Sequence, residues 1–229
     1  GDMERAEEIL RVKLGSKASK AAARIAAEGV VAVNLDGTVG AIVEVNSETD
    51  FVARNQKFQE MVSAIAAAAL KVKGDVDKLA AAKYGSGKAT VAETVKEMIG
   101  SIGENMTLRR AAHLSAAKGV VASYMHNTIA PGLGKIGVIV ALESAGDTER
   151  LKSFGRQIAM HIAAANPQAV TIDSLDKAVI ERERAVLTEQ AKESGKPAQV
   201  IEKMVEGRLR KFYEEVVLLA QAFVHDPET

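Results

Sequence analysis

The sequence predicts an α+β protein in which small antiparallel sheets are covered by helices. Alternating apolar runs occur in two pairs, at residues 30–33 with 41–45 and at residues 119–124 with 137–142, as is typical of hairpin strands. Longer stretches after each pair have apolar residues at helical spacing. The same four residues, Gly-Val-Val-Ala, occur at 29–32 and at 119–122, so we expect two related halves, each a hairpin followed by helices.

The first half contains most of the expected elements. Asp36-Gly37 is a strong turn signal between the first two strands. A helical apolar stripe follows and ends at Gly74. Further helices are predicted over residues 76–84 and 90–99. A weaker pattern over residues 106–115 indicates a strand. The members of the stripe are Phe58, Met61, Val62, Ile65 and Ala69.

The last third of the chain predicts a pair of helices. Residues 174–193 are charged and helical in pattern, and Gly195 and Pro197 then form a stop-and-restart signal. From Ile201 to Leu219 apolar residues recur in alternating steps of four and three, as in coiled coils. Because only about four residues join the two helices, we expect an antiparallel coiled-coil hairpin that protrudes from the globular part.

These patterns divide the chain into four expected segments. Residues 1–28 hold an amphipathic helix and a linker, and residues 29–117 form the first core half. Residues 118–172 form the second core half, and residues 173–229 form the helical hairpin with a return segment.

Composition limits the classes of function. The chain has 229 residues, 47% of them hydrophobic and 26% charged, as in ordinary folded proteins. Its formal net charge is zero, so we expect no direct nucleic-acid binding, because phosphate neutralisation needs a basic excess. No apolar stretch reaches membrane-spanning length, and a chain without cysteine has no disulfide, thiol nucleophile or thiolate metal site.

Two glycine-rich segments resemble nucleotide-binding loops by their letters. Residues 132–137 match the dinucleotide fingerprint, but a strand follows where a helix is required. Residues 85–88 resemble the end of a phosphate loop, but Ala89 stands where Ser or Thr is needed. Both are interpreted as plain loops, and no cofactor is expected. A nucleotide- or small-molecule-binding α+β enzyme that uses one of these loops is the alternative.

The histidines predict neither a metal site nor a catalytic group. His113, His126, His161 and His225 have no partner at the i+4 ligand spacing. His161 lies in an apolar helical stripe and is interpreted as a hydrogen-bonded core residue. His126 ends a strand beside a long loop, so it is expected at an exposed tip, either as a plain surface residue or as a contact residue. No Ser/His/Asp order and no isolated pair of carboxylates stands out as a catalytic constellation.

The corner formed by Thr49, Asp50 and Phe51 is the most informative point of the sequence, because a strand pattern changes there to a helical one. The Asp50 carboxylate can cap the following helix. Phe51 stands seven residues before Phe58, so it can extend the core stripe, as burial statistics favour. Its place at the helix start, where the core is thin, favours an exposed contact residue instead.

Several segments resemble the elongation factor Ts family. The clearest is the corner itself, VNSETDFVARN at residues 45–55. The others follow in family order along the whole chain: IGENMTLRR at 102–110, YMH at 124–126, IAMHIAA at 158–164, SGKP at 194–197 and KMVEGR at 203–208.

This resemblance implies a guanine-nucleotide exchange factor that promotes GDP release from elongation factor Tu in bacterial-type, cytoplasmic translation. Because such a factor changes no covalent bond, the resemblance also implies that the protein is not an enzyme. In the family, the Asp-Phe pair enters the partner's GTPase domain near its magnesium site, which maps onto Asp50 and Phe51. Ile102 and His126 match further residues of the family's contact surface. The resemblance therefore also implies that Phe51 is exposed at the start of a helix, with Asp50 beside it.

The resemblance also bears on the ends of the chain. The helical hairpin is a coiled-coil module in the family, which implies a homodimer, a 2:2 complex or a further partner contact. Members usually begin with a three-helix module, of which residues 1–28 match only the last helix and a linker. Members also continue with a strand and a helix beyond the point where this sequence ends.

Overall fold

A computed structural model describes residues 3–226, so the outermost residues of the expected segments 1–28 and 173–229 lie outside it. The chain divides into two compact units, with the boundary between Ala159 and Met160. Helix α6 (Thr148–Ala165) contains this boundary.

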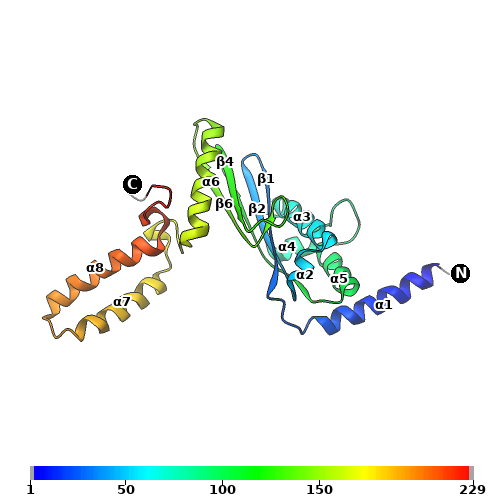
Figure 1. The fold of residues 1–229 in the computed structure, drawn as a ribbon, viewed down its shortest axis with the longest axis horizontal. Helices are drawn as coiled ribbons and strands as arrows, with labels where there is room; N and C mark the ends of the chain where they lie inside the picture. The colour runs from blue at the N-terminus through cyan, green and yellow to red at the C-terminus, as the bar shows by residue number, and fades with distance from the viewer. Residues whose placement is uncertain (1–2, 227–229) are drawn as a thin grey trace. The chain divides into compact units, whose positions relative to one another are not determined.

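The first unit mixes helices with antiparallel strands, which confirms the α+β class (Figure 1). Before α6 its elements are, in chain order, α1 (Met3–Ala21), β1 (Glu28–Asp36), β2 (Val39–Ser47), α2 (Asp50–Ala53), α3 (Gln56–Lys71), α4 (Val76–Ala81), α5 (Val91–Ile102), β3 (Met106–Ser115), β4 (Gly119–His126), β5 (Leu133–Gly134) and β6 (Ile136–Glu143).

The first sheet has the strand order β3-β2-β1-β5 and is antiparallel throughout. The turn predicted at Asp36-Gly37 joins β1 to β2, and Gly37 has the positive φ of 59° that this turn requires. The weakly predicted strand at residues 106–115 is present as β3. The short strand β5 was not predicted, because it lies inside the glycine-rich loop and pairs only Leu133 and Gly134 with β1.

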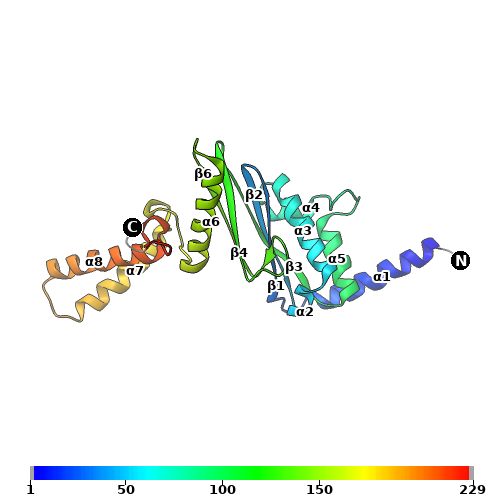
Figure 2. The ribbon, with the colours of Figure 1, turned by 45° about the horizontal axis from the view of Figure 1, so that its top comes forward.

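Helices cover one face of this sheet. The predicted stripe from Phe58 to Ala69 is buried on α3, which begins where the Asn55 side chain accepts a hydrogen bond from the Phe58 N–H. Helix α5 begins with a Thr90–Glu93 capping box and ends at Gly103. Helix α4 is shorter than the expected 76–84, because Ala82 is already extended. Figure 2 shows α3, α4 and α5 on one side of the sheet and β4 and β6 on the other.

The second sheet contains β4 and β6 and packs closely on the first. A Cβ atom placed on Gly40 of β2 would lie 2.6 Å from Val121 Cγ1, and one on Gly137 of β6 would lie 2.8 Å from Val31 Cγ1. In each of the two hairpins, a glycine therefore leaves room for a valine side chain of the other hairpin. A Cβ on Gly155 of α6 would lie 2.6 Å from that of Ala122, so this glycine allows α6 to approach β4.

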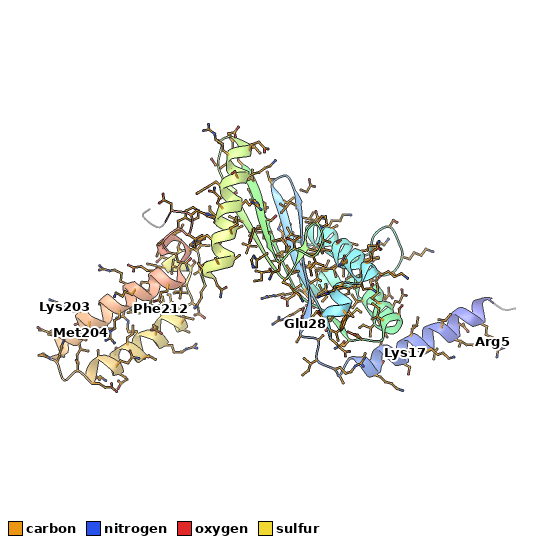
Figure 3. All side chains as sticks on the ribbon, in the orientation of Figure 1. Arg5, Lys17, Glu28, Lys203, Met204 and Phe212 are labelled. Carbon is orange, nitrogen blue, oxygen red and sulfur yellow. The ribbon has the colours of Figure 1, made fainter. Side chains whose placement is uncertain are left out.

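The second unit contains two packed helices, α7 (Lys177–Lys192) and α8 (Ala198–Val216). They share a small core of Leu187, Ala191, Val205 and Leu209, against which Met204 and Phe212 of α8 also pack (Figure 3).

His161 belongs to the same unit and is buried, as predicted. Its Nδ1 accepts a hydrogen bond from the Val224 N–H at 3.2 Å, and its Nε2 lies 2.9 Å from Gln221 Oε1. Both ring nitrogens thus have partners, so His161 is a satisfied core histidine.

Candidate partner-binding site

Phe51 lies on α2, a four-residue helix directly after β2, and 76% of the residue is exposed. Its neighbours Val52 and Ala53 are buried and anchor the helix. Helix α3 starts separately at Gln56, so Phe51 and Phe58 do not share one helical stripe. The structure therefore excludes the core alternative and confirms that Phe51 is exposed at a helix start.

Asp50 lies beside Phe51, but the predicted helix cap is wrong. Helix α2 begins at Asp50 itself, with Thr49 as the N-cap residue and no side-chain capping bond. The carboxylate therefore lies in the first turn instead of ahead of it. There it accepts a bond from Arg54 Nη2 at 3.3 Å, one helical turn later.

The corner before Phe51 is held by hydrogen bonds to the segment that connects α5 to β3. The Thr49 N–H donates to Glu104 Oε2 at 3.1 Å, and the Thr49 hydroxyl donates to Glu104 Oε1 at 2.9 Å. In the opposite direction, Glu48 Oε1 accepts a hydrogen bond from the Asn105 N–H. We name these contacts of Glu48, Thr49, Glu104 and Asn105 the carboxylate clamp.

The clamp continues the pairing of two strands. Ser47 of β2 is opposite Met106 of β3, so the next residues in register are Glu48 opposite Asn105 and Thr49 opposite Glu104. Side-chain carboxylates replace backbone carbonyls as acceptors where the ladder ends. The sequence patterns do not indicate Glu48 and Glu104 as site residues, and only the register of two predicted strands could have indicated them.

A third segment, between α1 and β1, reinforces the clamp. Arg24 Nε lies 3.0 Å from Glu48 Oε1, and Arg24 Nη2 donates to the Gly103 carbonyl at 2.6 Å. The Asn105 side-chain amide donates to the Arg24 carbonyl at 2.6 Å. Ile25, the next residue, is 85% exposed. It is a large exposed apolar residue next to Arg24 in the chain, which the sequence patterns did not reveal.

Ile102 and His126 occupy different surroundings. Ile102 is the last residue of α5, half-buried against the core, and Glu104 links its segment directly to the Phe51 corner. His126 is exposed at the end of β4, where its Nδ1 lies 3.0 Å from the Tyr124 hydroxyl. In the described part of the chain, no hydrogen bond or ion pair joins His126 to Asp50 or Ile102.

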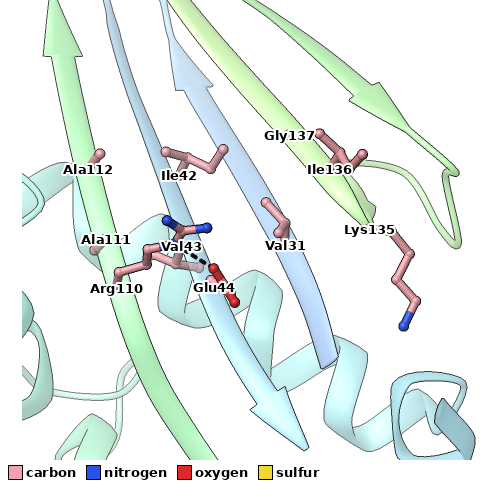
Figure 4. A pocket seen from close by; sticks show the side chains of 10 residues that line it. All are labelled: Val31, Ile42, Val43, Glu44, Arg110, Ala111, Ala112, Lys135, Ile136 and Gly137. Atoms are coloured by element: carbon pink, nitrogen blue, oxygen red, sulfur yellow. Dashed lines mark hydrogen bonds and ion pairs between the residues drawn. The ribbon is translucent and has the colours of Figure 1, made fainter. Parts of the chain in front are cut away.

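A cavity of 410 Å³ lies between the first sheet and the start of β6 (Figure 4). Its walls combine aliphatic side chains with three charged ones, Glu44, Arg110 and Lys135. The Glu44 carboxylate is ion-paired with Arg109 at 2.8 Å and with Arg110 at 2.5 Å. Burial raises the pKa of Glu44, but the hydrogen bonds and charges of the two arginines outweigh burial and leave that pKa below its usual 4.5. A carboxyl held ionised in this way is a poor general acid.

Neither glycine-rich segment lies between a strand and a helix. Residues 85–88 lie in the connection between α4 and α5, and residues 132–137 include β5 and the start of β6. Among residues 3–226, no cluster of three or more histidine or acidic side chains could hold a metal ion. Over the same residues, no helix is long and apolar enough to span a membrane.

Comparison with known proteins identifies the family. The family model described as elongation factor TS matches residues 48–229. Over 228 residues, which is 100% of this chain and 74% of each relative, the chain is 60% identical to elongation factor Ts of Parvibaculum lavamentivorans, 54% identical to that of Bartonella henselae and 55% identical to that of Allorhizobium ampelinum. This chain belongs to the elongation factor Ts family.

Proposed function

We propose that this chain promotes GDP release from elongation factor Tu by inserting Phe51, with Asp50 beside it, near the magnesium and phosphate site of that GTPase. Membership of the elongation factor Ts family supports the exchange role and the partner. The observation that favours Phe51 as the inserted group is its exposure of 76% on a short, anchored helix.

An exposed phenylalanine is a source of binding energy. Burial of its ring in a partner releases about 1.5–3 kcal/mol. If the ring fits only the nucleotide-free form of the GTPase, that energy favours nucleotide loss. By linkage, bound nucleotide must then weaken the binding of the factor by the same ratio. No covalent bond changes, so the exchange needs no catalytic side chain.

The same proposal gives roles to further parts of the chain. Ile102 and His126 are additional contact residues for the partner. Residues 29–117 and 118–172 are the two related core halves. The α7–α8 hairpin serves as a coiled-coil module for a homodimer, a 2:2 complex or a second partner contact. The place of action is bacterial translation in the cytoplasm, without direct contact to nucleic acid or membrane.

The test is the release of labelled GDP from elongation factor Tu in the presence of the wild-type chain or Phe51→Ala. We expect the variant to lose about tenfold or more of the acceleration, in line with the burial energy of one aromatic ring. Val12→Ala is the matched control, because Val12 is an apolar residue of α1 that is 73% exposed and has no contact role in this proposal. It should exchange as fast as wild type.

Undiminished GDP release with Phe51→Ala, in a protein whose thermal unfolding is unchanged, would exclude Phe51 as the inserted group. The alternative function, a nucleotide-binding enzyme, predicts a different result. The isolated chain would then bind GDP or NAD directly, whereas an exchange factor binds neither.

A further inference from the structure

We infer that Glu104 is a positioning residue for exchange, which fixes the direction in which Phe51 is presented without touching the partner's nucleotide site. This inference rests on the proposed function, because it assigns Glu104 a role through Phe51. Its basis is the carboxylate clamp, in which Glu104 binds the residue directly before Asp50.

Helix α2 cannot hold its own orientation. It has only four residues, and a single helical turn is unstable by itself. Its support comes from two sides. Val52 and Ala53 are buried against the core, and Thr49 is bound to Glu104 through both its N–H and its hydroxyl. Phe51 lies between these two anchors along the chain, so loss of either one frees the ring to turn.

The use of the Thr49 hydroxyl indicates what the clamp does. Threonine at an N-cap usually accepts a hydrogen bond from the first turn of its helix. Here the hydroxyl makes no capping bond and donates to Glu104 instead. The contact thus fixes α2 to the α5–β3 connection, whose start is also bound by Arg24 at the Gly103 carbonyl.

Glu104 offers Thr49 two acceptor oxygens. Its Oε2 accepts from the Thr49 N–H at 3.1 Å, and both of its oxygens lie within 3.0 Å of the Thr49 hydroxyl. Glutamine has one acceptor oxygen and one NH₂ group, and the NH₂ group can bond the Thr49 hydroxyl only if the hydroxyl oxygen turns from donor to acceptor. Glu104→Gln therefore keeps the size of the side chain but replaces charge-assisted hydrogen bonds by weaker neutral ones, which weakens the clamp. Thr49→Ser keeps both donors and should retain it.

A flexible corner would slow exchange more than it weakens binding. A group that is already oriented meets the productive geometry without further ordering. Phe51 on a loosened α2 would still reach the partner, but it would spend less time in the direction that displaces nucleotide. The maximal rate of GDP release at saturating factor should therefore fall more than the half-saturating concentration rises.

The decisive experiment is a double-mutant cycle with Glu104→Gln and Phe51→Ala, measured as the maximal rate of GDP release from elongation factor Tu. We expect Glu104→Gln to lower this rate about tenfold, as for loss of a charge-assisted hydrogen bond. In the Phe51→Ala background it should lower the rate by less than about twofold, because coupled residues are not additive.

Matched variants separate positioning from stability. Glu143 also accepts two backbone N–H groups, from Ala117 and Lys118, at 2.7 and 3.2 Å, but it lies in the β4–β6 hairpin. Glu143→Gln should exchange as wild type does. Thr49→Ser should retain the full rate, and Thr49→Val, which loses the hydroxyl bonds alone, should fall between wild type and Glu104→Gln. The Thr49 pair also provides the test if Glu104→Gln does not fold.

The outcomes distinguish the two proposals. If Phe51→Ala exchanges normally, the proposed function fails and the role of Glu104 fails with it. If Phe51→Ala is slow but Glu104→Gln is normal, only the positioning role fails. Equal effects of Glu104→Gln with and without Phe51, or a loss of the same size in Glu143→Gln, also overturn it. A slow Glu104→Gln whose effect disappears in Phe51→Ala supports it.

Discussion

Asp50 and Arg54 form an ion pair across one turn of the chain, with Asp50 Oδ2 3.3 Å from Arg54 Nη2. Both side chains are largely exposed, at 48% and 74%. An exposed pair of this kind contributes at most about 1 kcal/mol to stability. Its carboxylate is therefore free to exchange Arg54 for a polar group of a partner at little cost.

Asp50→Asn should leave stability almost unchanged and slow exchange. Because Asp50 is not a helix cap, we expect the free energy of unfolding to change by less than about 0.5 kcal/mol, whereas loss of a true cap costs about 1 kcal/mol. Chemical denaturation and GDP release measure the two effects. Arg54→Ala is the control, since it removes the same ion pair and keeps the carboxylate. Equal slowing in both variants would assign the effect to the ion pair and contradict a direct role of Asp50.

Much of the fold could be predicted from the sequence because its strong patterns are local. Alternation in β1 and β2, the turn at Gly37 and the stripe of α3 each lie within a few neighbouring residues. Strand β5 could not be predicted, because its two residues pair with a strand about 100 positions earlier in the chain. Short segments that depend on distant partners leave no periodic signal.

The candidate site could likewise be predicted only in part from the sequence. The family resemblance indicated Asp50, Phe51, Ile102 and His126 as contact residues. It also predicted that Phe51 is exposed, whereas burial statistics alone predicted a core residue. The carboxylate clamp was missed, because Glu48 and Glu104 are ordinary acidic residues in isolation and acquire a role only through the β2–β3 register. The error at Asp50 arose because the helix start was placed one residue late.

Glu44 should make stability depend on pH in the acid range. Its side chain is only 15% exposed and is bound by Arg109 and Arg110, which hold its pKa below 4.5 in the folded protein. Figure 4 shows the contact with Arg110. A carboxyl with a lowered folded pKa stabilises the folded state fully above its unfolded pKa. The contribution is lost as the pH falls from about 4.5 through the lower folded value.

Glu44→Gln should therefore be less stable than wild type at neutral pH, by about 1–2 kcal/mol, as for lost hydrogen bonds to charged groups. The difference should shrink as the pH falls below 4.5, because wild-type Glu44 then becomes protonated. Urea unfolding at a series of pH values measures this. Glu149→Gln, which removes an exposed pair with Lys152, should show neither effect. A pH-independent difference for Glu44→Gln would contradict the ionised pair.

Gly119, the first residue of β4, and Gly29, the second residue of β1, share a positive φ, at 144° and 137°, which glycine adopts easily and other residues rarely do. A Cβ on Gly119 would lie 1.9 Å from the Leu142 carbonyl oxygen, and one on Gly29 would lie 2.3 Å from that of Val45. Since backbone atoms cannot move aside as side chains do, we expect Gly119→Ala and Gly29→Ala each to lower the free energy of unfolding by about 3 kcal/mol or more.

The control for these two variants is Gly207→Ala on α8, where a Cβ would meet no atom within 4 Å. Alanine favours a helix over glycine by about 0.8–1 kcal/mol, so this change should stabilise the protein. Urea unfolding followed by circular dichroism measures all three variants. If Gly119→Ala unfolds at the same urea concentration as wild type, the close approach of β4 and β6 is not a steric requirement. If only one of the two strand glycines is sensitive, the two hairpins are not equivalent, which would weaken the proposal that they are related halves.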